Sequence, residues 1–147
     1  MAARTLSGVW EAYRIGVAAG IGAGAAVVAA GWLARTRSGM AAAILLGAAI
    51  GVVFGFLIDD WTEAVAGAAG GVLGGLGAVQ IVRGALRRGG TTSGTGILVA
   101  LAGVGVAALA LIPVVGYVEA VGLPAYAARL RKRAPERYAG LRTLARD

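Results

Sequence analysis

The residues of this chain that could do chemistry are mainly acidic, and one of them lies in an unusual place. Glu119 follows Tyr117 in an apolar stretch between Pro113 and Pro124. If this stretch lies in a membrane, the carboxyl group costs roughly 3 kcal/mol to insert, and such residues commonly bind protons or ions. Prolines on both sides can interrupt a helix and free backbone carbonyls for an ion. The alternative is that Glu119 lies at a turn in contact with water.

A second acidic group consists of Asp59, Asp60 and Glu63. Their carboxylates are hard oxygen ligands of the kind that Mg²⁺ or Ca²⁺ accepts, although their spacing matches no calcium-binding loop. The alternative is a hydrated loop that attracts cations and places acidic side chains at the start of a helix, where the helix dipole favours them. These three acids form one candidate proton or cation site together with Glu119 and Tyr117.

The chain lacks the side chains that most metal sites, disulfides and nucleophilic enzymes need. The chain has no cysteine and no histidine, which excludes zinc sites, iron–sulfur clusters and disulfides built from its own residues. The serines are Ser7, Ser38 and Ser93, and no histidine can activate them as nucleophiles. We therefore expect neither an enzyme nor a bound cofactor.

The composition is that of a membrane protein. Hydrophobic residues make up 59% of the 147 residues and charged residues 14%, against roughly 25% charged residues in soluble domains. Three uncharged apolar runs, residues 15–34, 39–58 and 64–82, are each long enough for a helix to cross a hydrocarbon layer of about 30 Å. Aromatic side chains that prefer the headgroup region lie at the edges of these runs, namely Trp10, Tyr13, Trp32 and Trp61. The sequence thus predicts an all-α, polytopic integral membrane helical bundle.

Residues 96–128 form a longer apolar region that allows two arrangements. If the chain turns near Pro113, it has five transmembrane helices, with twelve basic residues on one side and two on the other. If one long kinked helix spans the region, there are four helices, and nine basic residues face five. Basic residues near helix ends stay in the cytoplasm, so the more polarised five-helix arrangement is favoured. We expect a multi-pass protein of the cell membrane.

The last part of the chain is strongly basic. We expect a transmembrane helical bundle over residues 1–133 and a basic amphipathic cytoplasmic tail over residues 134–147. The net charge of +7 favours anionic lipid headgroups as partners. Nucleic acid is not expected, because the arginines interrupt apolar runs and do not form one face. The alternative for the tail is a hydrated segment without a partner. The candidate lipid-binding residues are Arg129, Arg131, Lys132, Arg133, Arg137 and Arg142.

Glycines recur at every fourth position in the first three apolar runs. A spacing of four keeps them on one face of a helix, where the missing side chains let helix backbones approach closely. The pattern resembles the glycine zippers of membrane proteins, and the resemblance implies helix packing. Either the three ladders hold the helices of one protomer together, or one ladder faces a second protomer and makes a homo-oligomer, as around a pore. The ladders consist of Gly16, Gly20 and Gly24, of Gly47, Gly51 and Gly55, and of Gly67, Gly71 and Gly75.

Two functions are compatible with these features. The first is a small channel or transporter, homo-oligomeric in one version, for protons, small cations or a small solute, with Glu119 as the titrating group. The second is a non-transporting membrane scaffold or accessory subunit that binds partner helices and anionic lipid. The first depends on the acidic residues and the second on the glycine ladders and the basic tail.

Overall fold

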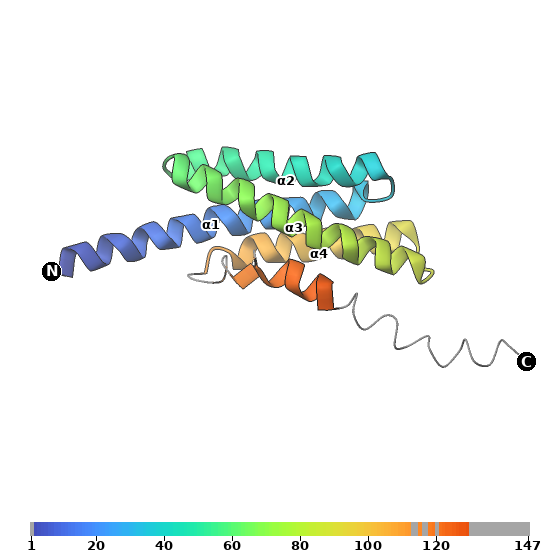
Figure 1. Ribbon diagram of the computed structural model, residues 1–147. Helices are drawn as coiled ribbons and strands as arrows, with labels where there is room; N and C mark the ends of the chain where they lie inside the picture. Colours follow the sequence, from blue (N-terminus) through green and yellow to red (C-terminus); the bar gives the residue numbers. More distant parts are fainter. Residues whose placement is uncertain (1, 113–114, 116–117, 120, 130–147) are drawn as a thin grey trace, which may run out of the picture.

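The computed structural model describes residues 2–112, 115, 118–119 and 121–129, with side chains from Ser7 onward. This part of the chain contains helices and no strand, so the all-α class is confirmed. Four of its helices are long and apolar enough to cross a membrane, the first of them over Ser7–Leu33. Figure 1 shows them as α1 (Ala2–Leu33), α2 (Arg37–Ile58), α3 (Trp61–Arg87) and α4 (Thr92–Leu109).

Short connections join these helices, and polar side chains cap the N-termini of α2 and α4. The hydroxyl of Thr36 accepts a hydrogen bond from Gly39 N at 3.0 Å, and that of Thr91 accepts one from Gly94 N at 3.3 Å. Each bond satisfies an N–H group that has no partner within the first helical turn. Between α3 and α4, Gly89 has a φ of +86°, which residues with a Cβ rarely adopt. The tight connections make consecutive helices antiparallel, and they place α2 beside both α1 and α3, whereas α4 packs mainly on α1.

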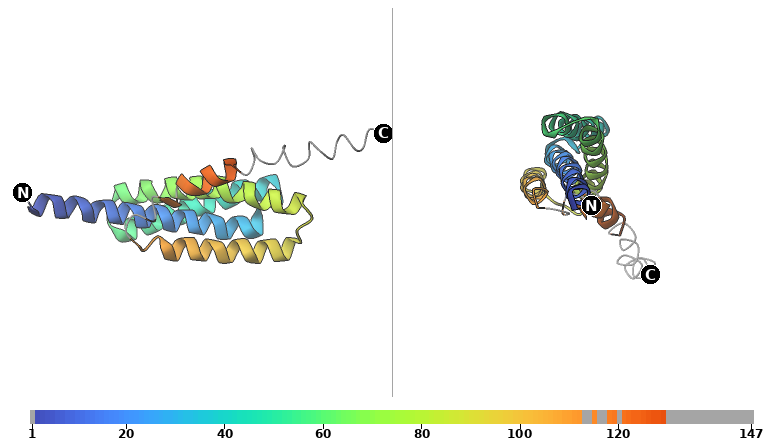
Figure 2. Two further views of the ribbon diagram at one scale, coloured as in Figure 1. Left: turned by 90° about the horizontal axis from the view of Figure 1, so that it is seen from below. Right: turned by 90° about the vertical axis from the view of Figure 1, so that its left-hand side faces the viewer.

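Helix α1 is the centre of the bundle. It packs against α2, α3 and α4, and α3 also packs against α2. The end-on view in Figure 2 shows α1 between α4 and the pair formed by α2 and α3. Buried residues make up 67% of the most apolar 18-residue window of α1 but only 11% of that of α4. The N-terminal part of α1 extends beyond the other helices (Figures 1 and 2).

Helices α1 and α3 run parallel in a definite register. A Cβ added to Gly74 would lie 2.6 Å from the Cα of Ala23, and one added to Gly70 would meet the backbone of Ala19. The two pairs have the same difference in residue number, 51. A Cβ on Gly22 would lie 3.0 Å from Gly71 N, a difference of 49. A residue of α1 therefore lies within about one helical turn of the level of the residue of α3 that is numbered 51 higher.

All nine glycines of the three predicted ladders are buried. A Cβ on Gly51 would meet the carbonyl of Gly67, and a Cβ on Gly67 would meet the carbonyl of Gly51. On α1, a Cβ on Gly24 would lie 2.8 Å from the carbonyl oxygen of Gly103 in α4. Each ladder glycine of α2 and α3 faces another helix of the same chain in this way.

The chain reverses after α4. That helix ends at Leu109, and Ala110 and Leu111 form a turn. Residues 121–129 are helical again and run back along the bundle (Figure 1). A Cβ on Gly77 of α3 would lie 3.0 Å from the backbone of Leu123, so this segment contacts α3. The single kinked helix considered for residues 96–128 is therefore not formed, and the chain turns close to the predicted position.

Candidate functional site

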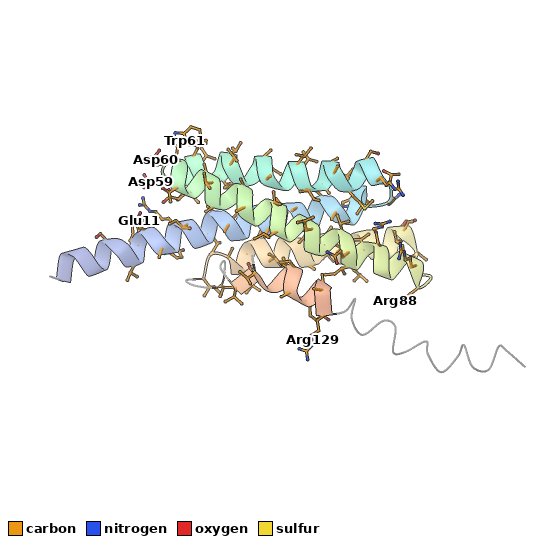
Figure 3. All side chains as sticks on the ribbon, viewed as in Figure 1. Glu11, Asp59, Asp60, Trp61, Arg88 and Arg129 are labelled. Carbon is orange, nitrogen blue, oxygen red and sulfur yellow. The ribbon has the colours of Figure 1, made fainter. Side chains whose placement is uncertain are left out.

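The ionisable side chains gather at the two ends of the bundle. Figure 3 shows Glu11, Asp59 and Asp60 at one end and Arg88 at the opposite end. The acidic end is formed where α2 meets α3, beside the part of α1 that precedes its central stretch. The other end is formed by the connection from α1 to α2 and the connection from α3 to α4. We describe the acidic end first because it holds most of the predicted site.

An arginine of α1 occupies the middle of the acidic group. The guanidinium of Arg14 forms an ion pair with the carboxylate of Asp59 through its terminal NH1 nitrogen, and its Nε lies 3.7 Å from Oε1 of Glu63. The side chain of Glu63 is only 2% exposed, that of Arg14 is 27% exposed and that of Asp59 is 46% exposed. A buried carboxylate needs a paired charge, and Arg14 supplies it. The pair also ties α1 to both helices of the α2–α3 hairpin.

Two further carboxylate oxygens of the acidic group accept hydrogen bonds from backbone N–H groups at the start of α3. The backbone N–H of Trp61 donates to Oδ1 of Asp60 at 2.7 Å, and the N–H of Asp60 donates to Oε2 of Glu63 at 3.4 Å. This reciprocal arrangement is a capping box, which satisfies N–H groups at the start of a helix. Within the part of the chain that the structure describes, no cluster of three or more acidic residues could hold a metal ion. The acidic group thus has a clear structural use.

The sequence did not identify Arg14 as a member of this group, because this residue only precedes the first apolar run, residues 15–34. One signal was available, because the five-helix arrangement places Arg14 and the three acids on the same side. The missing information was the register between α1 and α3, which the ladder spacing alone does not give. Such a contact between residues 45 and more positions apart depends on that register.

Glu119 is the other predicted site residue. Among the described residues, no ion pair or hydrogen bond joins it to the acidic group. It is half-buried. Its Oε2 atom is buried and has no hydrogen-bond partner among the residues that the structure describes. Tyr117 lies outside the described residues. The predicted five-residue site is therefore seen as a cluster of three acids and a separate carboxyl group.

Aromatic side chains mark the acidic end. Trp10 and Trp61 differ by 51 in residue number, so the register places them level with each other. The ring of Trp61 packs edge-on against Phe56 at 4.8 Å, and the ring of Trp10 lies 5.5 Å from that of Tyr13. The hydroxyl of Tyr13 donates to the carbonyl of Leu111 at 2.8 Å. This last bond fixes the chain just after α4 to α1.

The opposite end carries exposed arginines. Those of the connections and of the last turns of α3 are Arg35, Arg37, Arg83, Arg87 and Arg88, and all five are exposed. Arg129 is also exposed and projects from the last helical segment (Figure 3). The other predicted lipid-binding residues and the predicted tail lie outside the described residues. These are Arg131, Lys132, Arg133, Arg137 and Arg142.

Trp32 lies near the end of the bundle that carries these exposed arginines, which we call the arginine-rich end. It is 51% exposed, and it differs from Arg83 by 51 in residue number, which places the two side chains at about the same level. Trp32 is 22 positions after Trp10 on α1, a distance of about 33 Å along a helix.

Comparison of this chain with models of protein families, with curated proteins and with solved structures finds no match.

Proposed function

We propose that this chain is a non-transporting structural or accessory protein of the cell membrane. The observation that carries the proposal is the use of its polar and small residues inside the bundle. Arg14 forms ion pairs with Asp59 and Glu63, and all nine ladder glycines are buried within one protomer. The acids of the α2–α3 connection and the ladder glycines, which suggested a cation entrance and an oligomeric pore, thus have contacts within the chain. Ladders that hold one protomer together are the interpretation that this burial supports.

The outward surface of the bundle supports the same function. On α2, Leu45 and Leu57 are 69% and 73% exposed, and on α4 Leu98 is 70% exposed. Large apolar side chains on two outer helices suit contact with lipid or with helices of another protein. A scaffold needs such surfaces around a rigid centre. The centre here is α1, with backbones of three other helices packed on it.

We infer that the bundle crosses the membrane five times with its arginine-rich end in the cytoplasm. The tryptophan levels are about 33 Å apart, close to the hydrocarbon thickness of about 30 Å. Basic residues near helix ends favour the cytoplasmic side. Because the chain has no cysteine, Thr92→Cys and Thr143→Cys give single labelling sites. Both should react with a membrane-impermeant thiol reagent only from the cytoplasmic side, and labelling from opposite sides would contradict five crossings.

The test of the main proposal is a flux measurement. The purified chain is reconstituted in vesicles that contain a pH-sensitive or potassium-sensitive dye, and an ion gradient is imposed. We expect the same leak as in protein-free vesicles, with an added ionophore as the positive control. Flux that increases with the amount of protein would overturn the proposal.

One observation favours transport as a second candidate function. Within the described part of the chain, the Oε2 atom of Glu119 is buried without a hydrogen-bond partner, and an unpartnered carboxyl group can accept a proton or a cation. In this case the chain should carry flux, and Glu119→Gln should abolish it while the unfolding midpoint stays unchanged. Equal flux in Glu119→Gln would remove Glu119 from the transport step.

A further inference from the structure

The arginines of the two connections at one end of the bundle form a single charged surface. The arginine-rich end carries Arg35, Arg37, Arg83, Arg87 and Arg88. The fold explains their proximity, because α1 and α3 run parallel and both end here: Arg35 and Arg37 lie in and directly after the connection from α1 to α2, and the other three lie in the last turns of α3 and at its C-cap. The contact of Gly31 with Gly96 brings the start of α4 to the same end. Five guanidinium groups far apart in sequence therefore share one end of the molecule.

The charge of this surface is not neutralised by nearby acids of the described chain. The acidic residues of the α2–α3 connection lie at the opposite end, and Glu11 lies there too (Figure 3). Among the described residues, Arg14 is the arginine that forms ion pairs, and it lies at the acidic end. The five arginines of the arginine-rich end are all exposed. The surface thus combines high positive charge with access from outside.

Apolar surface begins directly beside these arginines. Leu33 and Ile97 are exposed at the ends of α1 and α4, and Trp32 is exposed at the level of Arg83. An indole ring of this kind prefers the boundary between headgroups and acyl chains. Arg87 and Arg88 come about one turn after Arg83, or roughly 6 Å farther along the axis. Their side chains are then at the depth of the lipid phosphates.

We infer that the arginine-rich end binds the headgroups of anionic phospholipids in one leaflet. The inference rests on the proposed membrane function and names the partner of that protein. A guanidinium group forms paired hydrogen bonds with phosphate oxygens, while the adjacent apolar side chains contact the acyl chains. Of the phosphate-bearing partners, a phospholipid presents both chemistries in one molecule. Soluble phosphates and nucleic acid have no apolar part for the exposed Leu33 and Ile97.

The test measures lipid binding by native mass spectrometry of the full chain in a neutral detergent. Phosphatidylglycerol and phosphatidylcholine of the same acyl length are titrated separately. We expect a clear preference for phosphatidylglycerol in the unmodified chain. In the triple variant Arg83→Gln, Arg87→Gln and Arg88→Gln, its affinity should fall on the order of 100-fold, since each arginine near a membrane surface contributes about a fivefold factor. Binding of phosphatidylcholine should change little.

Two controls make the result specific. Replacing the same three residues with lysine keeps the charge and should retain most of the preference, and Glu11→Gln at the opposite end should leave it unchanged. The double variant Arg35→Gln and Arg37→Gln examines the other connection, with an expected loss of about 20-fold. Unfolding midpoints equal to that of the unmodified chain show that each variant is folded.

The inference is overturned if the unmodified chain binds both lipids equally, or if neither set of glutamine variants lowers the affinity for phosphatidylglycerol. These outcomes are separate from those of the flux test. A chain without lipid preference can still fail to carry flux, which leaves the proposed function in place. A chain that prefers phosphatidylglycerol and carries flux would overturn the proposed function but not the lipid surface.

Discussion

Two glycines of α4 provide a direct test of the helix packing. Gly103 is buried, and a Cβ placed on it would lie 2.7 Å from Val28 N and 2.8 Å from the carbonyl oxygen of Gly24. Gly105 lies two positions farther on, and a Cβ placed on it would meet nothing within 4 Å. We therefore expect Gly103→Ala to destabilise the bundle and Gly105→Ala to be tolerated. The two substitutions are chemically identical and lie at nearly the same depth.

The size of the effect follows from the contact distances. To move from 2.8 Å to an ordinary carbon–oxygen contact of about 3.3–3.6 Å, α4 has to retreat from α1 by roughly 0.5–0.8 Å. A gap of this size removes about a quarter to a half of the dispersion energy of the contacts that it opens. Overpacking of this kind costs about 1–3 kcal/mol. The gain in helix propensity from glycine to alanine, about 1 kcal/mol, is common to both variants and cancels between them.

The assay is reversible unfolding in mixed micelles with increasing mole fraction of sodium dodecyl sulfate, followed by tryptophan fluorescence. Trp32 is a suitable reporter because its ring lies 4.0 Å from the Cβ position of Gly96, at the contact between α1 and α4. We expect the free energy of unfolding of Gly103→Ala to be about 1–3 kcal/mol lower than that of Gly105→Ala. Equal stability of the two variants would refute the reasoning from backbone contact.

Three further substitutions examine the ends of the bundle by the same unfolding measurement. Arg14→Gln should lower the free energy of unfolding by about 3 kcal/mol because it leaves the buried carboxylate of Glu63 unpaired, and adding Glu63→Gln should restore part of the loss; an additive loss in the double variant would argue against the pair. Asp60→Ala should cost about 1 kcal/mol through loss of the capping box, whereas Asp60→Asn should be nearly neutral; equal losses would contradict the capping role. Gly89→Ala should cost about 1–2 kcal/mol because of its positive φ alone, with a smaller cost for Gly89→Asn; an unchanged midpoint in Gly89→Ala would show that the turn tolerates a Cβ.

The sequence predicted the apolar helices well because the long uncharged runs are explicit in it. The first helix begins earlier than expected, with an apolar stretch over Ser7–Leu33 in place of residues 15–34. The reason is that Glu11 and Arg14 end the apolar run but not the hydrogen-bonded backbone. A turn follows α4 at Ala110 and Leu111, close to Pro113, where the five-helix arrangement expects it, while the number of membrane crossings stays a prediction. A proline lacks an N–H and disfavours a helical residue before it.

The glycine spacing predicted buried faces but only part of them. In α3 the predicted ladder faces α2, whereas Gly70 and Gly74 form a second buried face toward α1 that the sequence analysis did not single out. A helix between two neighbours needs two such faces, and a search for one repeat of four finds only one of them. The partner of each face depends on helix order in space. That order is a property of the whole bundle and is not contained in any single run.

The central position of α1 has a consequence for the synthesis of the protein. Every helix that covers it follows it in the chain and is made later. Asp59, the nearest of the counter-charges to Arg14 in sequence, follows it by 45 positions, which corresponds to roughly 2–9 s at translation rates of about 5–20 residues per second. During this interval the arginine stands at the membrane edge without its acidic partners. Completion of the α2–α3 hairpin is thus the step that neutralises the first helix and fixes it in the bundle.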